Sequence, residues 1–145
     1  MPRKPEDLYL DLMKKTLSFL LWPEPPLPID STNFNRSRLK RSSIALLTRL
    51  LDPMKLRLVT IRSYSDEQRA EGKVWPYPAY ADTMIGVKRL DNLQQCVQKV
   101  LEDRIEGDFI ETGVWRVWSC IFMRAILAAY GIEDRKIFVA DSFEG

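Results

Sequence analysis

The 145-residue sequence contains no histidine, so it lacks the side chain that most often acts as a general base near neutral pH. Acid–base chemistry would have to use Asp, Glu, Lys, Tyr or a residue outside this chain. Cysteine is also scarce: Cys96 and Cys120 lie in predicted helices and lack the CxxC spacing of a metal site. We therefore expect two buried free thiols in a reducing compartment.

An excess of charge of one sign and long apolar runs are also missing. The sequence has 22 Lys and Arg against 20 Asp and Glu, a net charge of only +2, which argues against nucleic acid as the main partner. No apolar run reaches the roughly 18 residues needed to span a bilayer. Residues 1–7 lack the apolar core of a signal peptide. The sequence thus predicts a soluble cytoplasmic protein without a nucleic-acid or membrane partner.

What the sequence does contain is ordinary globular composition, with 46% hydrophobic and 29% charged residues. Apolar residues recur at three- and four-residue steps over 6–22, 37–51 and 82–104, which predicts three helices. Prolines and polar residues at 23–35 predict an extended linker. Residues 55–61 fit either a short strand or a continuation of the preceding helix, and the sequence does not decide between them.

Two segments of this amino-terminal region have two interpretations each. The helix at 37–51 has a basic polar face, which suits a membrane surface or an anionic partner. It also suits a solvated face whose arginines pair with acids elsewhere, and the near-zero net charge favours this second interpretation. The aromatic segment at 74–81 is barred from a helix interior by Pro76 and Pro78. It fits a stiff lid over a pocket and packing filler equally well.

The carboxyl-terminal part predicts a strand, a tight turn, a helix and a second strand. The first apolar strand ends in Glu111 and meets Gly113, a helical pattern covers 121–130, and a strand over 136–140 ends in Asp141. Open parallel sheets bind nucleotide-like ligands at the carboxyl ends of their strands. Because the other glycines of a dinucleotide fingerprint are absent, spacing alone leaves a purely structural unit open. A nicotinamide- or nucleotide-binding domain would rest on fold analogy only.

Three motifs occur in order along the chain: TMIGVKRLDNL at 83–93, ETGVWR at 111–116 and DSFEG at 141–145. Together they resemble the macrocin/mycinamicin O-methyltransferase (TylF/MycF-like) family. The segments at 7–12 and 124–131 are similar to that family too. The resemblance covers most of residues 6–22 and 74–145, and the three motifs together are far more specific than the glycine turn alone.

This resemblance implies an α/β fold: a Rossmann-like class I methyltransferase start of strand, helix and strand, with an incomplete sheet, after a mostly helical amino-terminal region. It divides the chain into 1–81, with helices, linker and lid-like segment, and 82–145, the first part of a domain that binds S-adenosylmethionine (SAM). The implied function is methylation of a sugar hydroxyl on a macrolide-like natural product by a homo-oligomer. Magnesium is implied as well, but its ligands and the proposed catalytic base would lie downstream of Gly145.

The resemblance also implies the residues of the SAM site. Thr83 and Met84 would touch the methionine part, Glu111 and Gly113 would line the turn beneath it, and Asp141 would hold the ribose hydroxyls. The full implied set is Thr83, Met84, Glu111, Thr112, Gly113, Val114, Trp115, Asp141 and Ser142.

Two departures from the family favour an alternative, a degenerate or truncated module that binds or oligomerises without catalysis. The family has two glycines where this chain has Val117 and Trp118. A valine with positive φ would be an outlier, and a tryptophan would crowd the pocket. The chain also stops at Gly145, before the strand on the far side of the ligand crevice. We therefore expect no turnover by these 145 residues, marginal stability, and self-association through open sheet edges.

Overall fold

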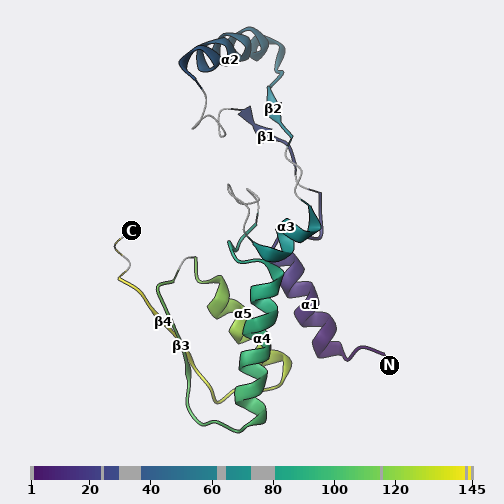
Figure 1. Cartoon of the computed structure of the whole chain (residues 1–145), viewed down its shortest axis with the longest axis vertical. Coiled ribbons are helices and arrows are strands. Elements are labelled where there is room, and N and C mark those ends of the chain that lie inside the picture. Colours follow the sequence, from purple (N-terminus) through teal and green to yellow (C-terminus); the bar gives the residue numbers. More distant parts are fainter. Residues whose placement is uncertain are drawn as a thin grey trace. The chain divides into compact units, whose positions relative to one another are not determined.

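The computed structural model describes residues 2–23, 25–29, 37–61, 65–72, 81–114, 116–142 and 144. The chain divides into two compact units. The main unit consists of residues 1–22 and 64–145, and the second, here called the 23–63 unit, consists of the residues between them. Figure 1 shows the two units along the chain.

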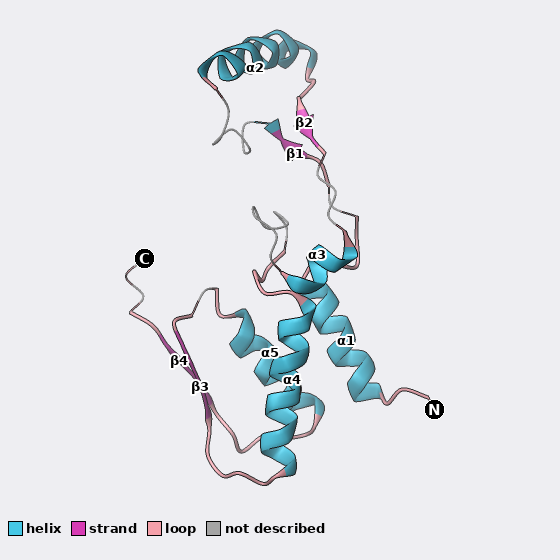
Figure 2. Ribbon diagram, in the orientation of Figure 1, coloured by secondary structure: helices cyan, strands magenta, loops and turns pink. Residues whose placement is uncertain are grey.

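The main unit packs helices against one face of a parallel pair of strands (Figure 2). Strands β3 and β4 are joined by α5, which contacts β4, α1 and α4. The elements of this unit are α1 (Pro5–Leu17), α3 (Asp66–Glu71), α4 (Val87–Glu102), β3 (Phe109–Thr112), α5 (Trp118–Ala129) and β4 (Ile137–Ala140). The strand–helix–strand order predicted from the sequence is therefore present.

Helix α5 is the centre of the core because it has neighbours on three sides. Its buried residues are Cys120, Phe122, Met123, Ala125, Ile126 and Leu127. Helix α1 adds Leu10 and Leu17, and helix α4 adds Leu90 and Val97. The opposite face of the strand pair is open, since Ile110 is 64% exposed and Phe138 is 50% exposed.

Side chains at the amino ends of the two strands hold the parallel register. The Lys136 amide donates to Asp108 Oδ1 at 2.8 Å. The Arg135 guanidinium donates to the carbonyls of Ile105 and Gly107 and lies 5.8 Å from the centre of the Phe109 ring. Phe109 then pairs with Ile137, and the register continues to the opposite ends of both strands.

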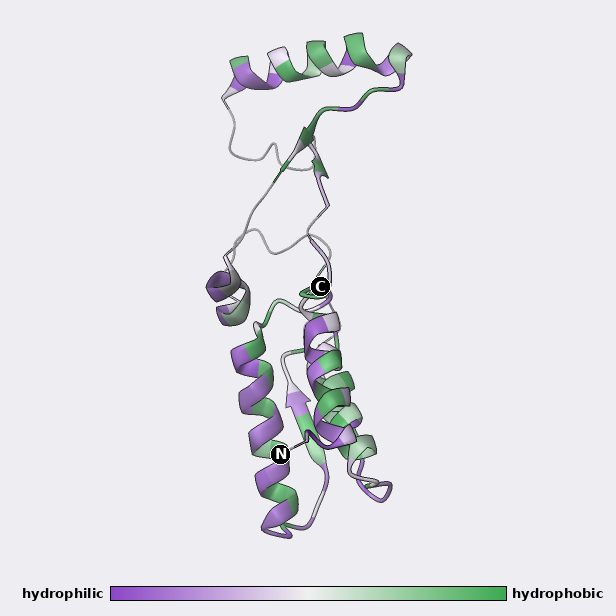
Figure 3. Cartoon of the chain, turned by 90° about the vertical axis from the view of Figure 1, so that its right-hand side faces the viewer, coloured by the Kyte–Doolittle hydropathy of each residue, from purple (hydrophilic) through white to green (hydrophobic). Residues whose placement is uncertain are grey.

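The 23–63 unit has little core of its own. Its elements are β1 (Leu27–Pro28), α2 (Arg38–Leu51), η2 (Asp52–Met54) and β2 (Val59–Thr60), and β1 pairs with β2 in antiparallel fashion. None of the α2 residues is buried, and Leu39 is 82% exposed. Figure 3 shows α2, at the top, with both hydrophobic and hydrophilic residues along its length.

Two helices are shorter than their apolar patterns predict. Helix α1 ends at Leu17 rather than at residue 22, because Phe19 adopts φ 54° and the Leu20 amide donates back to the Lys15 carbonyl. Helix α4 covers Val87–Glu102 rather than 82–104, with Gly86 as its N-cap. Apolar periodicity predicts the buried face of a helix better than the residue at which the helix stops.

The structure confirms some of the remaining sequence predictions and corrects others. The helix predicted at 37–51 is present as α2, although Ser37 makes no capping hydrogen bond through its side chain. Segment 55–61, for which the sequence allowed a strand or a helix, contains the short strand β2. Cys120 is buried as expected, but Cys96 is exposed, which corrects that half of the prediction. Of the lid-like segment predicted at 74–81, only Ala81 is among the described residues. The predicted domain boundary after residue 81 stays a prediction.

Candidate functional site

The carboxyl ends of β3 and β4 place two carboxylates at one edge of the strand pair. The register pairs Glu111 with Val139 and Thr112 with Ala140, so Asp141 follows directly beside the turn after β3. The Gly113 amide continues the ladder with a 3.1 Å bond to the Ala140 carbonyl. Parallel pairing therefore brings together residues that lie thirty positions apart in the sequence, at the edge where open α/β sheets hold their ligands.

Asp141 ties the turn to the second strand. Its Oδ2 accepts a 2.6 Å hydrogen bond from the Val114 amide. Its Oδ1 lies 3.4 Å from the Ser142 hydroxyl, and that hydroxyl also accepts from the Glu144 amide at 3.4 Å. One carboxylate oxygen thus fixes the turn, and the other faces a hydroxyl. Such an arrangement can accept further hydrogen bonds from a ligand, because an ionised carboxylate has about four lone-pair sites.

The turn between β3 and α5 uses left-handed backbone conformations. Gly113 has φ 71°, and the consecutive residues Arg116 and Val117 have φ 56° and 62°. Val117 is the N-cap of α5, in the conformation that a β-branched side chain rarely adopts. Trp118, the first residue of α5, is partly buried and packs against the hydrophobic core, and the expected crowding of a pocket stays a prediction. Trp115, also predicted for the site, lies outside the described residues.

Glu111 contacts the first turn of α5 through the Cys120 thiol. The Cys120 thiol donates to Glu111 Oε2 across 2.8 Å, and Cys120 is only 5% exposed. Burial, followed by the hydrogen bond and the charge of Glu111, raises the pKa of the Cys120 thiol to about 12. The thiol is therefore a protonated, neutral donor at physiological pH.

Thr83 and Met84 lie just before α4, at the end of the main unit that also holds the carboxyl ends of the strands (Figure 1). Thr83 is 7% exposed, and its amide donates to the Leu17 carbonyl at 3.2 Å. Its hydroxyl accepts a 3.3 Å bond from the Ile85 amide. The structure thus anchors this segment to the end of α1 and brings it to the same end of the unit as Glu111 and Asp141.

Two polar residues at this end were missed in the sequence. The sequence indicated only that Cys120 is a buried thiol. Cys120 is the third residue of α5, and its thiol contacts Glu111 near the end of β3. Ser18 is 7% exposed, and its hydroxyl has no hydrogen-bond partner among the described residues. Nothing in the apolar pattern of α1 distinguishes Ser18, because its burial follows from the early end of that helix.

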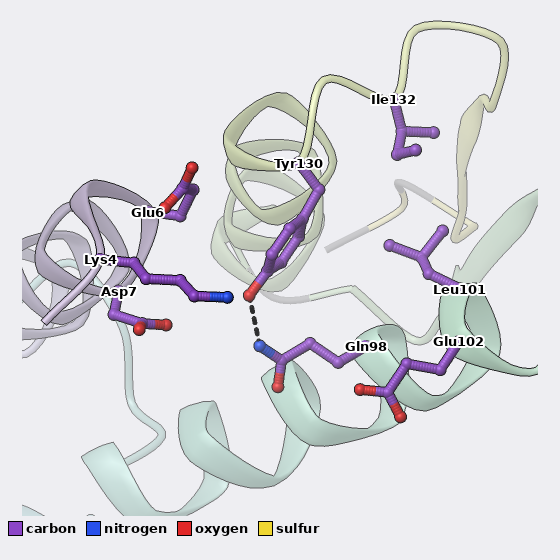
Figure 4. A pocket seen from close by; sticks show the side chains of 8 residues that line it. All are labelled: Lys4, Glu6, Asp7, Gln98, Leu101, Glu102, Tyr130 and Ile132. Atoms are coloured by element: carbon purple, nitrogen blue, oxygen red, sulfur yellow. Dashed lines mark hydrogen bonds between the residues drawn. The ribbon is translucent and has the colours of Figure 1, made fainter. Parts of the chain in front are cut away.

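A cavity of about 570 Å³ lies at the opposite end of the main unit, where α1 begins and α4 and α5 end (Figure 4). Gln98 donates there to the Tyr130 hydroxyl. The lining residues are Lys4, Glu6, Asp7, Gln98, Leu101, Glu102, Tyr130 and Ile132. None of them belongs to the predicted site, so this cavity and the two carboxylates at the strand ends are separate features.

Within the described ranges, no group of three or more His, Cys, Asp or Glu side chains could hold a metal ion. Among the helices that the structure describes, none is long and apolar enough to cross a membrane. The donor set at the strand ends consists of carboxylates, hydroxyls and backbone amides, which suits an organic ligand with hydroxyl, ammonium and carboxylate groups.

The carboxyl-terminal part of the chain is an α/β unit of strand, helix and strand with two carboxylates at the ends of its strands. A family model described as macrocin-O-methyltransferase (TylF) matches residues 6–145, and the chain belongs to that family. The resemblance drawn from the three sequence motifs is thereby confirmed.

Individual relatives agree with this membership. The chain is 40% identical over 139 residues to mycinamicin III 3''-O-methyltransferase of Micromonospora griseorubida, covering 96% of this chain and 43% of that protein. It is 41% identical to demethyldecarbamoylnovobiocin O-methyltransferase of Streptomyces niveus, covering 95% of this chain and 42% of that one. The chain therefore spans less than half the length of these relatives.

A solved structure of the O-methyltransferase NovP has a similar fold. It superposes with a TM-score of 0.65 at 38% sequence identity, covering 97% of this chain and 43% of NovP. The chain is thus similar in fold to part of an O-methyltransferase.

Proposed function

We propose that this chain is the amino-terminal part of a SAM-dependent O-methyltransferase that acts on a sugar hydroxyl of a glycosylated natural product. The observation that carries the proposal is the pair of carboxylates, Glu111 and Asp141, at the carboxyl ends of two parallel strands in a chain of the TylF family. We further propose a class I, Rossmann-like fold for the complete protein, a cytoplasmic location and a homo-oligomer.

The ribose and the methionine part of SAM each have complementary groups in the proposed site. Asp141 accepts hydrogen bonds from the ribose hydroxyls, as an acid at the end of the second strand does in related folds. Glu111 attracts the methionine ammonium. The amides at the start of α5 offer partial positive charge to the methionine carboxylate. Thr83 and Met84 border the methionine part. The proposed site also includes Thr112, Gly113, Val114, Trp115 and Ser142.

When bound, SAM supplies a methyl group already activated by its sulfonium. The residues of this chain therefore mainly hold the cofactor in one orientation, because alignment of the two reacting atoms removes much of the barrier. The acceptor hydroxyl must lose its proton, and this chain contributes no histidine for that step. We assign the base, and the magnesium ligands that the family resemblance implies, to a part of the protein outside these 145 residues.

A chimera tests this proposal. Residues 1–145 are joined to the part of mycinamicin III 3''-O-methyltransferase that this chain does not match, and SAM is titrated by calorimetry. We expect binding, and we expect Asp141→Ala to weaken it at least about tenfold, because several hydrogen bonds to a charged acceptor are lost. Asp134→Ala is the matched control, since Asp134 is exposed at the other end of β4. No binding, or equal losses in both variants, would overturn the proposal.

A second candidate, a non-catalytic module of the same family, is favoured by one observation. Val117 stands at φ 62°, in place of one of the two glycines of the resembled family. If this substitution has damaged the site, the double change Val117→Gly and Trp118→Gly in the chimera raises SAM affinity. Unchanged affinity would show that the Val–Trp pair is tolerated, and the second candidate would lose its support.

A further inference from the structure

The geometry points to Cys120 as a positioning residue for SAM: we propose that its thiol orients the Glu111 carboxylate toward the bound methionine ammonium. This inference rests on the proposed function, because it assigns a role beside a site residue of that function. The contact that carries it is the 2.8 Å bond from Cys120 Sγ to Glu111 Oε2.

The direction of the Glu111 side chain follows from the strand. Along β3, Phe109 and Glu111 are half-buried while Ile110 and Thr112 are exposed. Successive side chains of a strand alternate between its faces, so Glu111 points toward the helix layer. A carboxylate that leaves water must be hydrogen-bonded, or its burial costs free energy. Cys120 supplies a donor from the first turn of α5, where the helix faces the end of the strand.

A neutral donor suits a carboxylate that must bind a cation. A lysine or arginine at the same place would also orient Glu111 but would cancel its charge. The thiol engages one oxygen, Oε2, and brings no positive charge to the carboxylate. Because Cys120 is 5% exposed and its pKa is raised to about 12, the thiol stays protonated across the neutral range. The orientation of Glu111 should therefore not depend on pH between about 6 and 9.

Packing alone does not account for the contact. Cys120 belongs to the buried cluster with Phe122 and Ile126, where packing requires an apolar side chain but no hydrogen-bond donor. An apolar side chain at this position would leave Glu111 without this donor. The two roles of Cys120, core packing and donation to Glu111, can therefore be separated by substitution: serine keeps a donor, and alanine removes it.

The first experiment uses the 145-residue chain with Cys96→Ser, which leaves Cys120 as its single thiol. The rate of modification by methyl methanethiosulfonate is measured from pH 7 to pH 10. We expect Cys120 to react more than about a hundredfold more slowly than Cys96 does in a Cys120→Ser chain, because the thiolate is the reactive form. Glu111→Gln should speed the reaction of Cys120 more than about tenfold, since the negative charge beside it is removed. Glu106→Gln, an exposed control, should not. An unchanged rate and pH profile in Glu111→Gln would overturn the pairing.

The second experiment measures SAM affinity in the chimera described above, together with the midpoint of thermal unfolding. We expect Cys120→Ala to weaken SAM about fivefold, the equivalent of one ordinary hydrogen bond. We expect Cys120→Ser to stay within about twofold of the unsubstituted chimera when both are measured at the same pH. Rescue by serine, at equal unfolding temperatures, separates positioning from packing.

The outcomes distinguish this inference from the proposed function. If Glu111→Gln weakens SAM while Cys120→Ala and Cys120→Ser bind equally well, the site stands and the positioning role of Cys120 is wrong. If Glu111→Gln leaves SAM affinity unchanged, the assignment of Glu111 fails, and the role of Cys120 fails with it. A chimera that does not bind SAM at all overturns both.

Discussion

The two units of this chain differ in how far they bury their apolar side chains. In the main unit, α5 is surrounded by α1, α4 and β4, and side chains such as Phe122 and Leu127 are fully buried. In the 23–63 unit, α2 has a comparable length and many leucines, yet none of its residues is buried. Helix formation thus depends on local sequence in both units, and among the described residues the buried core cluster that stabilises helices lies in the main unit. The following variants test that difference, from the largest expected effect to the smallest.

Two helical leucines, one buried and one exposed, provide the strongest test. Leu90 in α4 has no exposed surface, and Leu39 in α2 is 82% exposed. Leu90→Ala should lower the free energy of unfolding by about 3 kcal/mol through lost burial and the cavity left behind. Leu39→Ala should change it by less than about 0.5 kcal/mol. Urea unfolding followed by circular dichroism measures both. A similar loss in the two variants would show that α2 buries its leucines in solution.

A close backbone contact in the main unit comes next. Gly86 packs against the end of α3, and a Cβ placed there would lie 2.3 Å from the Ala70 carbonyl oxygen. Because backbone atoms cannot give way easily, Gly86→Ala should cost about 2 kcal/mol. Gly131→Ala is the control, since its Cβ would meet open space and only the left-handed backbone would be strained, at about 1 kcal/mol. The prediction fails if the control loses as much stability as Gly86→Ala in the same thermal melt.

An ion pair between helices should matter more than one within a helix. Lys14 of α1 contacts Asp91 of α4, and the Lys14 side chain is only 13% exposed. Asp91→Asn should therefore lower stability by about 1 kcal/mol. Asp103→Asn removes the exposed pair with Lys99 one turn away, which is worth about 0.3 kcal/mol. Denaturation midpoints at low and high salt check both values, and a larger salt-sensitive loss in Asp103→Asn would contradict this ranking.

The smallest expected effect is an increase in stability. Val117→Gly relieves a valine at φ 62° but adds backbone freedom to the unfolded chain, so we expect a net stabilisation of about 0.5 kcal/mol. Lys55, at φ 56° in the 23–63 unit, gives the comparison. Lys55→Gly relieves strain where no core is formed, so the main unfolding transition should stay in place. A lower unfolding temperature for Val117→Gly would show that its side chain stabilises the turn.

Much of the main unit could be predicted because its signals are local. The strand ending in Glu111, the glycine turn, the helix and the strand ending in Asp141 each follow from short patterns, and the structure contains all of them. The helix ends were harder to predict. Apolar residues continue past Leu17, but Phe19 turns left-handed and the chain leaves the helix there. Periodicity reports which face is buried, and helix ends depend on hydrogen bonds with residues far along the chain.

Burial was the least predictable property. Cys96 and Cys120 both lie within apolar helical patterns, yet Cys96 is exposed on α4 while Cys120 is enclosed by three neighbouring elements. The 23–63 unit shows the same limit, since the leucine stripe of α2 predicts a buried face that the structure leaves open. A pattern states that a helix has an apolar side, and tertiary packing decides what covers that side.

The sequence by itself determined the order of elements, the family and the identity of the acidic residues at the strand ends, because motifs and periodicity are properties of neighbouring residues. Only the tertiary structure decided what those acids contact. Parallel pairing of β3 and β4 brings Asp141 onto the Val114 amide, and the packing of α5 brings the Cys120 thiol onto Glu111. These contacts join residues that the sequence separates, so they arise only when the strands pair and the helix packs against them.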